Sequence, residues 1–190
     1  MENALRAFIA VEITSEIRKE LIRLQSELKK SLKGNISWVE PENIHLTLRF
    51  LGQISDAQLE EIKKIVDETA KKIKRFNMDL GVIGAFPDIS NPRIVWVGIN
   101  YGFNQLNEIN AELEDRLEII NFAVGEKYFH PHLTIARVKS IDGENSLDEI
   151  TQKIHPKQLP ETVDKLIIFQ SEITPQGANY TELFEAHLSK

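Results

Sequence analysis

Residues 44–48 read Ile-His-Leu-Thr-Leu, and residues 131–135 read Pro-His-Leu-Thr-Ile. Both contain a His-x-Thr-x pattern in which the two x positions are aliphatic. In a β-strand, successive side chains point to opposite faces of the sheet. The aliphatic residues would then enter the core, while each histidine would lie beside a threonine on the other face. The sequence therefore predicts two strands, one in each half of the chain, that each present an imidazole next to a hydroxyl.

The repetition of this pattern carries more weight than either copy. The chain has 5 histidines and 8 threonines among 190 residues, so random placement gives about 0.2 His-x-Thr triplets and two copies are roughly a one-in-fifty event. A single copy would more often be a solvated histidine beside a common strand former. Two copies, one in each half of a chain with a repeated layout, favour a functional site instead.

The rest of the chain alternates helical and strand patterns. Apolar residues recur every three to four positions over residues 17–32 and 59–73, which predicts two amphipathic helices, and Ser55 with Gln58 predicts a capping box at the start of the second. Strands are predicted over residues 44–51, 78–86 and 162–173, and the two glycines at 81 and 84 weaken the second of these patterns. Several predicted strand pairs have connections too short for a parallel crossover, so these pairs must be antiparallel. We therefore predict an α+β fold with two pseudo-symmetric antiparallel sheets, flanked by helices around a central active-site cleft. One bilobal domain spans residues 1–190, and its lobes contribute the strands at 45–48 and 132–135.

Composition excludes several classes of site and partner. The chain has no cysteine, which excludes a thiolate nucleophile, disulfides, cysteine-ligated zinc and iron–sulfur clusters. Its net charge is −6, whereas proteins that bind long stretches of nucleic-acid backbone are usually basic. No segment has the roughly 18 apolar residues of a membrane helix. The N-terminus lacks the features of a signal peptide, so we expect a cytoplasmic protein that does not bind membranes.

Two His-Thr pairs on facing strands suit the cleavage of a phosphodiester. The nucleophile and the leaving oxygen lie on opposite sides of phosphorus, so one side needs a base and the other needs an acid. Histidine serves both roles because its ordinary pKa lies near 6.5. Threonine hydroxyls and nearby arginines can hydrogen-bond the non-bridging oxygens as charge builds on them. This chemistry requires no metal or other cofactor.

The paired His-x-Thr-x motifs resemble those of the 2H phosphoesterases, and most closely the RNA 2′,3′-cyclic phosphodiesterase branch, also called 2′-5′ RNA ligases. The supporting segments are Arg-Ala-Phe-Ile-Ala-Val at 6–11, Asn-Ile-His-Leu-Thr-Leu-Arg-Phe-Leu-Gly at 43–52, Pro-Arg-Ile-Val-Trp-Val-Gly at 92–98 and Phe-His-Pro-His-Leu-Thr-Ile-Ala-Arg at 129–137. The resemblance runs over nearly the whole chain.

This resemblance implies hydrolysis of RNA 2′,3′-cyclic phosphate ends to 2′-phosphomonoesters without a metal. It also implies a 2′-5′ ligation of such ends to 5′-hydroxyl ends. His45 would be the proton donor and His132 the proton acceptor, while Thr47 and Thr134 would bind the phosphate. The near symmetry of the site leaves an exchange of the two histidine roles open. The expected partner is an RNA with a cyclic-phosphate terminus, such as a tRNA half, and we expect a monomer.

Five further residues are candidate substrate contacts. Arg49 shares the predicted strand face of His45, so we expect it to contact phosphate and to be the main contributor to a basic pocket. Arg137 would reach the site only through a strand end or a β-bulge. His130 would line the cleft or pack structurally, since no acidic residue accompanies it as a metal ligand. Phe8 and Tyr180 could stack on a terminal base.

Two other aromatic expectations concern Phe50, Phe86 and the two tryptophans. Phe50 and Phe86 could also stack on a base, although each is more often a core residue. Trp38 and Trp96 are expected in the core.

Two alternative functions remain open from the sequence. One keeps the chemistry but acts on a small cyclic nucleotide, which the net charge of −6 favours slightly. The other is a non-catalytic protein that binds RNA termini, which would not require an acid–base pair of histidines.

Overall fold

The computed structural model describes residues 4–123, 125, 128–142, 146–174 and 177–190. Among these residues, no helix is both long and apolar enough to cross a membrane.

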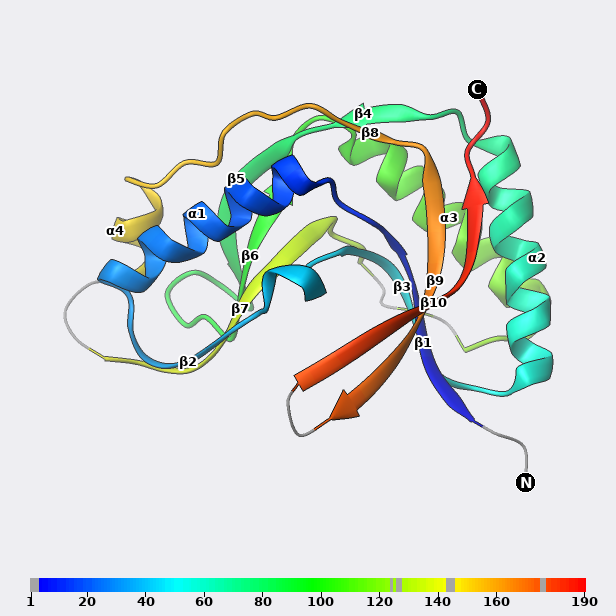
Figure 1. Cartoon of the computed structure of the whole chain (residues 1–190), viewed down its shortest axis with the longest axis horizontal. Helices are drawn as coiled ribbons and strands as arrows, with labels where there is room; N and C mark the ends of the chain where they lie inside the picture. The colour runs from blue at the N-terminus through cyan, green and yellow to red at the C-terminus, as the bar shows by residue number, and fades with distance from the viewer. Residues whose placement is uncertain (1–3, 124, 126–127, 143–145, 175–176) are drawn as a thin grey trace.

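One half of the main sheet contains the two ends of the chain. Its strands are β1 (Leu5–Val11), β3 (Leu46–Ile54), β9 (Lys165–Thr174) and β10 (Gly177–His187). They follow the order β10-β9-β1-β3, and every neighbouring pair is antiparallel. In Figure 1, the paired strands β9 and β10 extend toward the bottom of the view as a long hairpin.

The other half consists of β5 (Leu80–Phe86), β6 (Ile94–Ile99) and β7 (His132–Asp142), with β2 (Lys33–Trp38) also paired to β7. These pairs are antiparallel too. The two halves meet between β3 and β7, where the register gives one residue pair, Leu46 with Leu133. Separately, β4 (Phe76–Met78) pairs with β8 (Glu161–Val163). The predicted α+β class with antiparallel sheets is confirmed.

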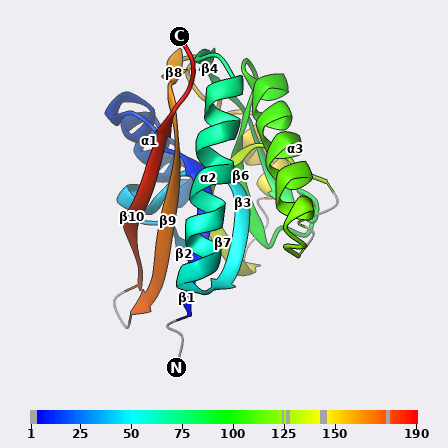
Figure 2. The same ribbon diagram turned by 90° about the vertical axis from the view of Figure 1, so that its right-hand side faces the viewer.

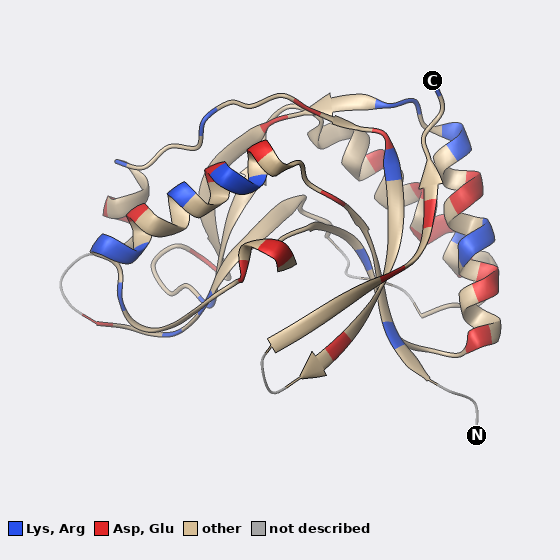
Figure 3. Ribbon diagram, viewed as in Figure 1, with Lys and Arg blue, Asp and Glu red and all other residues tan. Residues whose placement is uncertain are grey.

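The helices divide between the two halves. Helices α2 (Asp56–Lys72) and α3 (Phe103–Ile119) lie side by side over the half that contains β3, β9 and β10 (Figure 2). Helix α1 (Ser15–Ser31) contacts β2 and the 3-10 turn η1 (Pro41–Asn43), and the short α4 (Leu147–Thr151) follows β7. Along α1 and α2, basic residues are interspersed with acidic ones (Figure 3). These helices present a mixed-charge surface.

Local sequence explains where two of these helices begin. The Ser55 hydroxyl accepts a hydrogen bond from the backbone N–H of Gln58, and the Gln58 side-chain oxygen accepts one from the backbone N–H of Ser55, so the expected capping box is present. The Thr14 side chain caps α1 in a similar way by accepting from the backbone of Ile17. Both caps satisfy backbone N–H groups that the first turn leaves without helical partners.

Strand boundaries differ from the predictions in three places. The strand expected near residue 44 begins at Leu46. The segment expected as one strand over 162–173 forms both β8 and β9. Strand β2 was not predicted. Its sequence, Lys-Gly-Asn-Ile-Ser-Trp, lacks a strong strand pattern, and the strand depends on pairing with β7.

Candidate active site

The pairing of Leu46 with Leu133 brings the two His-x-Thr motifs together. Continued by one residue in each direction, this antiparallel register would set His45 opposite Thr134 and Thr47 opposite His132. Both leucines are fully buried, so the two histidines and two threonines share the other face of the sheet. His45 and His132 are diagonal neighbours, which lie about 7–8 Å apart on a regular ladder. A separation of this size leaves room for a phosphate group between the two imidazoles.

His45 lies in an aromatic environment made by the half of the sheet that contains β1, β9 and β10. Its ring stacks on Phe8 with centroids 4.5 Å apart and meets Tyr180 edge-on at 4.9 Å. Burial lowers the pKa of His45 from 6.5 to about 4, and the charge of Arg18 acts in the same direction, while a hydrogen bond to the backbone of Asn43 opposes them. His45 is therefore neutral at pH 7 in the substrate-free protein.

His132 has a similar arrangement in the other half. Its Nδ1 lies 2.7 Å from the carbonyl oxygen of His130. A carbonyl oxygen only accepts, so Nδ1 is the donor in this contact. Phe86 meets the His132 ring edge-on at 5.1 Å. Each motif histidine thus bonds to the backbone of the residue two positions before it, which fixes the orientation of both rings.

Trp96 belongs to this site rather than to the core, contrary to the prediction. Its ring lies 4.8 Å from that of His130 and 6.2 Å from that of His132. A Cβ on Gly84 would come within 2.3–2.8 Å of three atoms of the indole, so the absence of a side chain at Gly84 lets the indole lie against the sheet. The Trp96 Nε1 is buried and has no hydrogen-bond partner among the described residues.

The predicted position of Arg49 is wrong. The register with β1 runs from Ala10–Thr47 to Ile9–Arg49, so Leu48 is an extra residue in a β-bulge. The alternation of side chains between the two faces therefore shifts by one residue after Thr47. Arg49 lies on the same face as its partner, the buried Ile9.

The contacts of Arg49 agree with this register. Its guanidinium forms an ion pair with Glu114 of α3 and donates to the backbone carbonyls of Phe50 and Ala123. Arg49 is 9% exposed. It joins the sheet to α3 and to the segment that follows α3, away from the two histidines.

A matching bulge brings Arg137 to the site. In β7, Ile135 is the extra residue between the pairs Trp96–Thr134 and Val95–Ala136. Arg137 pairs with Ile94 and so shares the face of Thr134 and His132. The bulge on which this placement was predicted to depend is present, at the same motif position as the bulge in β3. Arg137, unlike Arg49, is therefore a basic residue on this face.

Two arginines near the site were missed by the sequence analysis. The positive charges of Arg137 and Arg6 both act on the Tyr180 hydroxyl, whose pKa is nevertheless raised because burial has the larger effect. Arg18 acts on His45 in the same electrostatic way. Arg6 could have been found from its spacing of two residues before Phe8 on one strand. The result is a set of cations around the motifs of an acidic protein.

The remaining candidates have distinct surroundings. Phe8 is buried beneath His45, so it supports the imidazole rather than offering a free face. Tyr180 is half-buried and borders His45. His130 is exposed and packs against Trp96, Phe86 and Phe103. The described residues contain no group of three or more His, Cys, Asp or Glu side chains placed to hold a metal ion.

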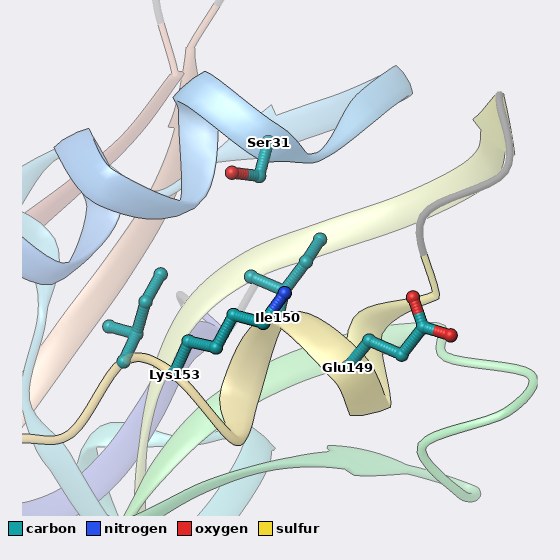
Figure 4. Close-up of a pocket in the computed structure, with 5 residues that line it drawn as sticks. Ser31, Glu149, Ile150 and Lys153 are labelled. Atoms are coloured by element: carbon teal, nitrogen blue, oxygen red, sulfur yellow. The ribbon is translucent and has the colours of Figure 1, made fainter.

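Two surface pockets lie away from the motifs. One is lined by residues of α1 and α4 and of the segment after α4, namely Ser31, Glu149, Ile150, Lys153 and Ile154 (Figure 4). The other is lined by Arg75, Phe76, Asn77 and Thr162 beside β4 and β8. Neither contains a histidine.

Known proteins resemble this chain along its whole length. A family model described as LigT like Phosphoesterase matches residues 11–96 and again residues 97–180, so each match contains one motif. The RNA 2′,3′-cyclic phosphodiesterase of Aquifex aeolicus is 34% identical over 187 residues, covering 97% of each chain. The Methanocaldococcus jannaschii protein of the same name is 35% identical over 182 residues, covering 95% of this chain and 99% of its own.

Solved structures share the fold. TT0787 of Thermus thermophilus has a TM-score of 0.80 at 24% identity, covering 97% of this chain and 98% of its own. E. coli LigT has a TM-score of 0.77 at 22% identity, covering 100% of both chains.

Proposed function

The chain belongs to the LigT-like phosphoesterase family, and from this premise we propose that it hydrolyses RNA 2′,3′-cyclic phosphate ends to 2′-phosphomonoesters. The observation that carries the proposal is the Leu46–Leu133 pairing, which puts two His-Thr pairs on one face. The names of the curated relatives supply the substrate class.

Each motif residue has one role in this reaction. His132 takes a proton from water through Nε2, and the water oxygen forms a bond to phosphorus. The bond from phosphorus to the ribose 3′ oxygen breaks, and His45 protonates that oxygen. Thr47 and Thr134 donate hydrogen bonds to the non-bridging oxygens, where negative charge increases. The phosphate remains on the 2′ oxygen, and the two imidazoles complete the proton transfer without a metal.

The low pKa of His45 has a consequence for this assignment. His45 must hold a proton to act as the acid, yet it is neutral at pH 7 in the free protein. A bound cyclic phosphate carries a negative charge, which favours the protonated imidazole. We therefore propose that substrate binding and proton uptake by His45 are coupled. A 5′-hydroxyl in place of water gives 2′-5′ ligation with the same roles, since His132 takes the proton of the 5′-hydroxyl and His45 protonates the departing 3′ oxygen. Cleavage of the 2′-5′ bond is the reverse reaction, in which the two histidines exchange roles.

The proposed partner, cellular location and oligomeric state depend on this reaction. The proposed partner is an RNA that ends in a cyclic phosphate, such as a tRNA half, bound by a cytoplasmic monomer. The acidic protein recognises the terminal phosphate locally through Arg137 and the two threonines, rather than a long stretch of backbone.

The test uses an oligonucleotide with a 2′,3′-cyclic phosphate in a buffer that contains a chelator. The wild-type protein should convert it to a 2′-phosphate product. His45→Ala and His132→Ala should each lose at least about 100-fold in kcat, since a positioned acid or base contributes about 10²–10⁴. His155→Ala is the matched control, because His155 is an exposed histidine outside both motifs. Activity that disappears with chelator and returns with zinc would refute the metal-free mechanism.

A further inference from the structure

A strip of side chains leads away from the motifs along β1 and β3. The register pairs Ala10 with Thr47, then Phe8 with Phe50, then Arg6 with Gln53. Positions 6, 8 and 10 of β1 share one face because side chains alternate along a strand. The bulges in β3 keep Thr47, Phe50 and Gln53 on that same face. The strip therefore runs from the phosphate-binding threonine to an aromatic pair and then to an arginine.

Phe50 offers an open aromatic face next to the catalytic group. It is 54% exposed, whereas its neighbour Phe8 is 3% exposed. The Phe50 and Phe8 ring centroids are 6.2 Å apart, and the Phe8 and His45 centroids are 4.5 Å apart. Phe8 thus fills the space beneath His45, and Phe50 continues the apolar surface outward. An exposed aromatic ring in such a place is a platform on which a nucleobase of any sequence can stack.

Arg6 supplies a positive charge at the far end of the strip. It lies four residues before Ala10 on β1, which corresponds to about 13 Å at the rise of a strand. Its side chain is exposed, and its charge acts on the hydroxyl of Tyr180, which borders His45. A guanidinium is suited to binding phosphate through paired N–H donors. The charge therefore lies at the end of the strip that is farthest from Thr47.

We propose that Phe50 and Arg6 form a subsite for the nucleotide that precedes the cyclic-phosphate terminus, with Phe50 stacking on its base and Arg6 binding its phosphate. This proposal rests on the proposed function and narrows its substrate class to RNA of two or more nucleotides. A mononucleoside 2′,3′-cyclic phosphate reaches the motifs but leaves the subsite empty. The enzyme therefore prefers the longer substrate.

The test compares two substrates that share a terminal nucleoside. One is adenosine 2′,3′-cyclic phosphate, and the other is a trinucleotide that ends in the same group. The ratio of their kcat/KM values, trinucleotide over mononucleoside, should exceed one for the wild type. Phe50→Ala should lower this ratio about 5- to 150-fold, the range expected for one stacked base, and Phe50→Trp should retain it. Arg6→Gln should reduce the salt dependence of kcat/KM for the trinucleotide alone.

Val82→Ala is the matched control, because Val82 is an apolar strand residue on β5 that is 71% exposed. It should leave the ratio at its wild-type value. A wild-type ratio of one, or a ratio that Phe50→Ala does not change, would overturn the subsite while leaving the hydrolase assignment in place. If the wild type hydrolyses neither of the two substrates, the proposed function itself is overturned.

Discussion

Lowering the pH from 7 to 5 should destabilise this protein through His45. Burial holds the pKa of the folded imidazole at about 4, against an ordinary value of 6.5. Between these values the unfolded chain binds a proton that the folded chain does not, so the free energy of unfolding decreases as the pH falls. The stability that a neutral His45 permits is present above pH 6.5 and is lost by about pH 4. At 1.36 kcal/mol per pKa unit, the full loss is about 3 kcal/mol, of which about 2 kcal/mol falls between pH 7 and 5.

Urea unfolding at pH 7 and pH 5 measures this loss. Other groups also titrate in this range, so the informative quantity is the difference between the wild type and His45→Gln. The wild type should lose about 2 kcal/mol more than His45→Gln, because glutamine does not titrate. His155→Gln replaces an exposed histidine and should lose as much as the wild type. Equal losses in the wild type and His45→Gln would refute the neutral, buried state of His45.

Three other predictions concern the remaining site residues. His132→Ala should leave the circular dichroism spectrum unchanged and abolish hydrolysis, but the proton uptake that His45 couples to phosphate binding should remain, so that calorimetry still finds pH-dependent phosphate binding. Loss of that pH dependence in His132→Ala would contradict the assignment of the coupled proton to His45. Arg49→Leu should lower the free energy of unfolding by about 2–3 kcal/mol, because it breaks a mostly buried ion pair with Glu114. Arg137→Leu should instead lower kcat/KM about tenfold and leave the urea midpoint unchanged, because Arg137 contacts the substrate phosphate. The reverse pattern would contradict the bulge assignments. Gly84→Ala should cost about 1–3 kcal/mol of stability by displacing the Trp96 indole, and adding Trp96→Leu should recover part of that loss; no cost from Gly84→Ala would contradict the packing.

The sequence predicted those elements that depend on residues close together in the chain. Periodic apolar residues predicted α1 and α2, and Ser55 with Gln58 predicted the start of α2. The alternation around His45 and His132 correctly predicted which side chains oppose the buried leucines. These features depend on neighbours along the chain, so a single sequence suffices for them.

The sequence could not predict features that depend on register between distant strands. Parity along one strand placed Arg49 beside His45 and Arg137 on the opposite face. The bulges at Leu48 and Ile135 reverse both placements, because each adds one residue relative to the neighbouring strand. The packing of Trp96 over Gly84 has the same origin, since it joins two strands across a hairpin. Gly84 weakens the strand pattern of its segment in the sequence, although its lack of a side chain makes room for Trp96 beside His130 and His132.

The position of the phosphate in the product tests the central claim most directly. A synthetic RNA with a 2′,3′-cyclic phosphate end is incubated with the wild-type protein in chelator, and the product is identified by phosphorus NMR against 2′- and 3′-phosphate standards. Protonation of the 3′ oxygen by His45 predicts a 2′-phosphomonoester, formed by the wild type and not by His45→Ala. A 3′-phosphomonoester, or equal product from His45→Ala, would contradict the two-histidine account.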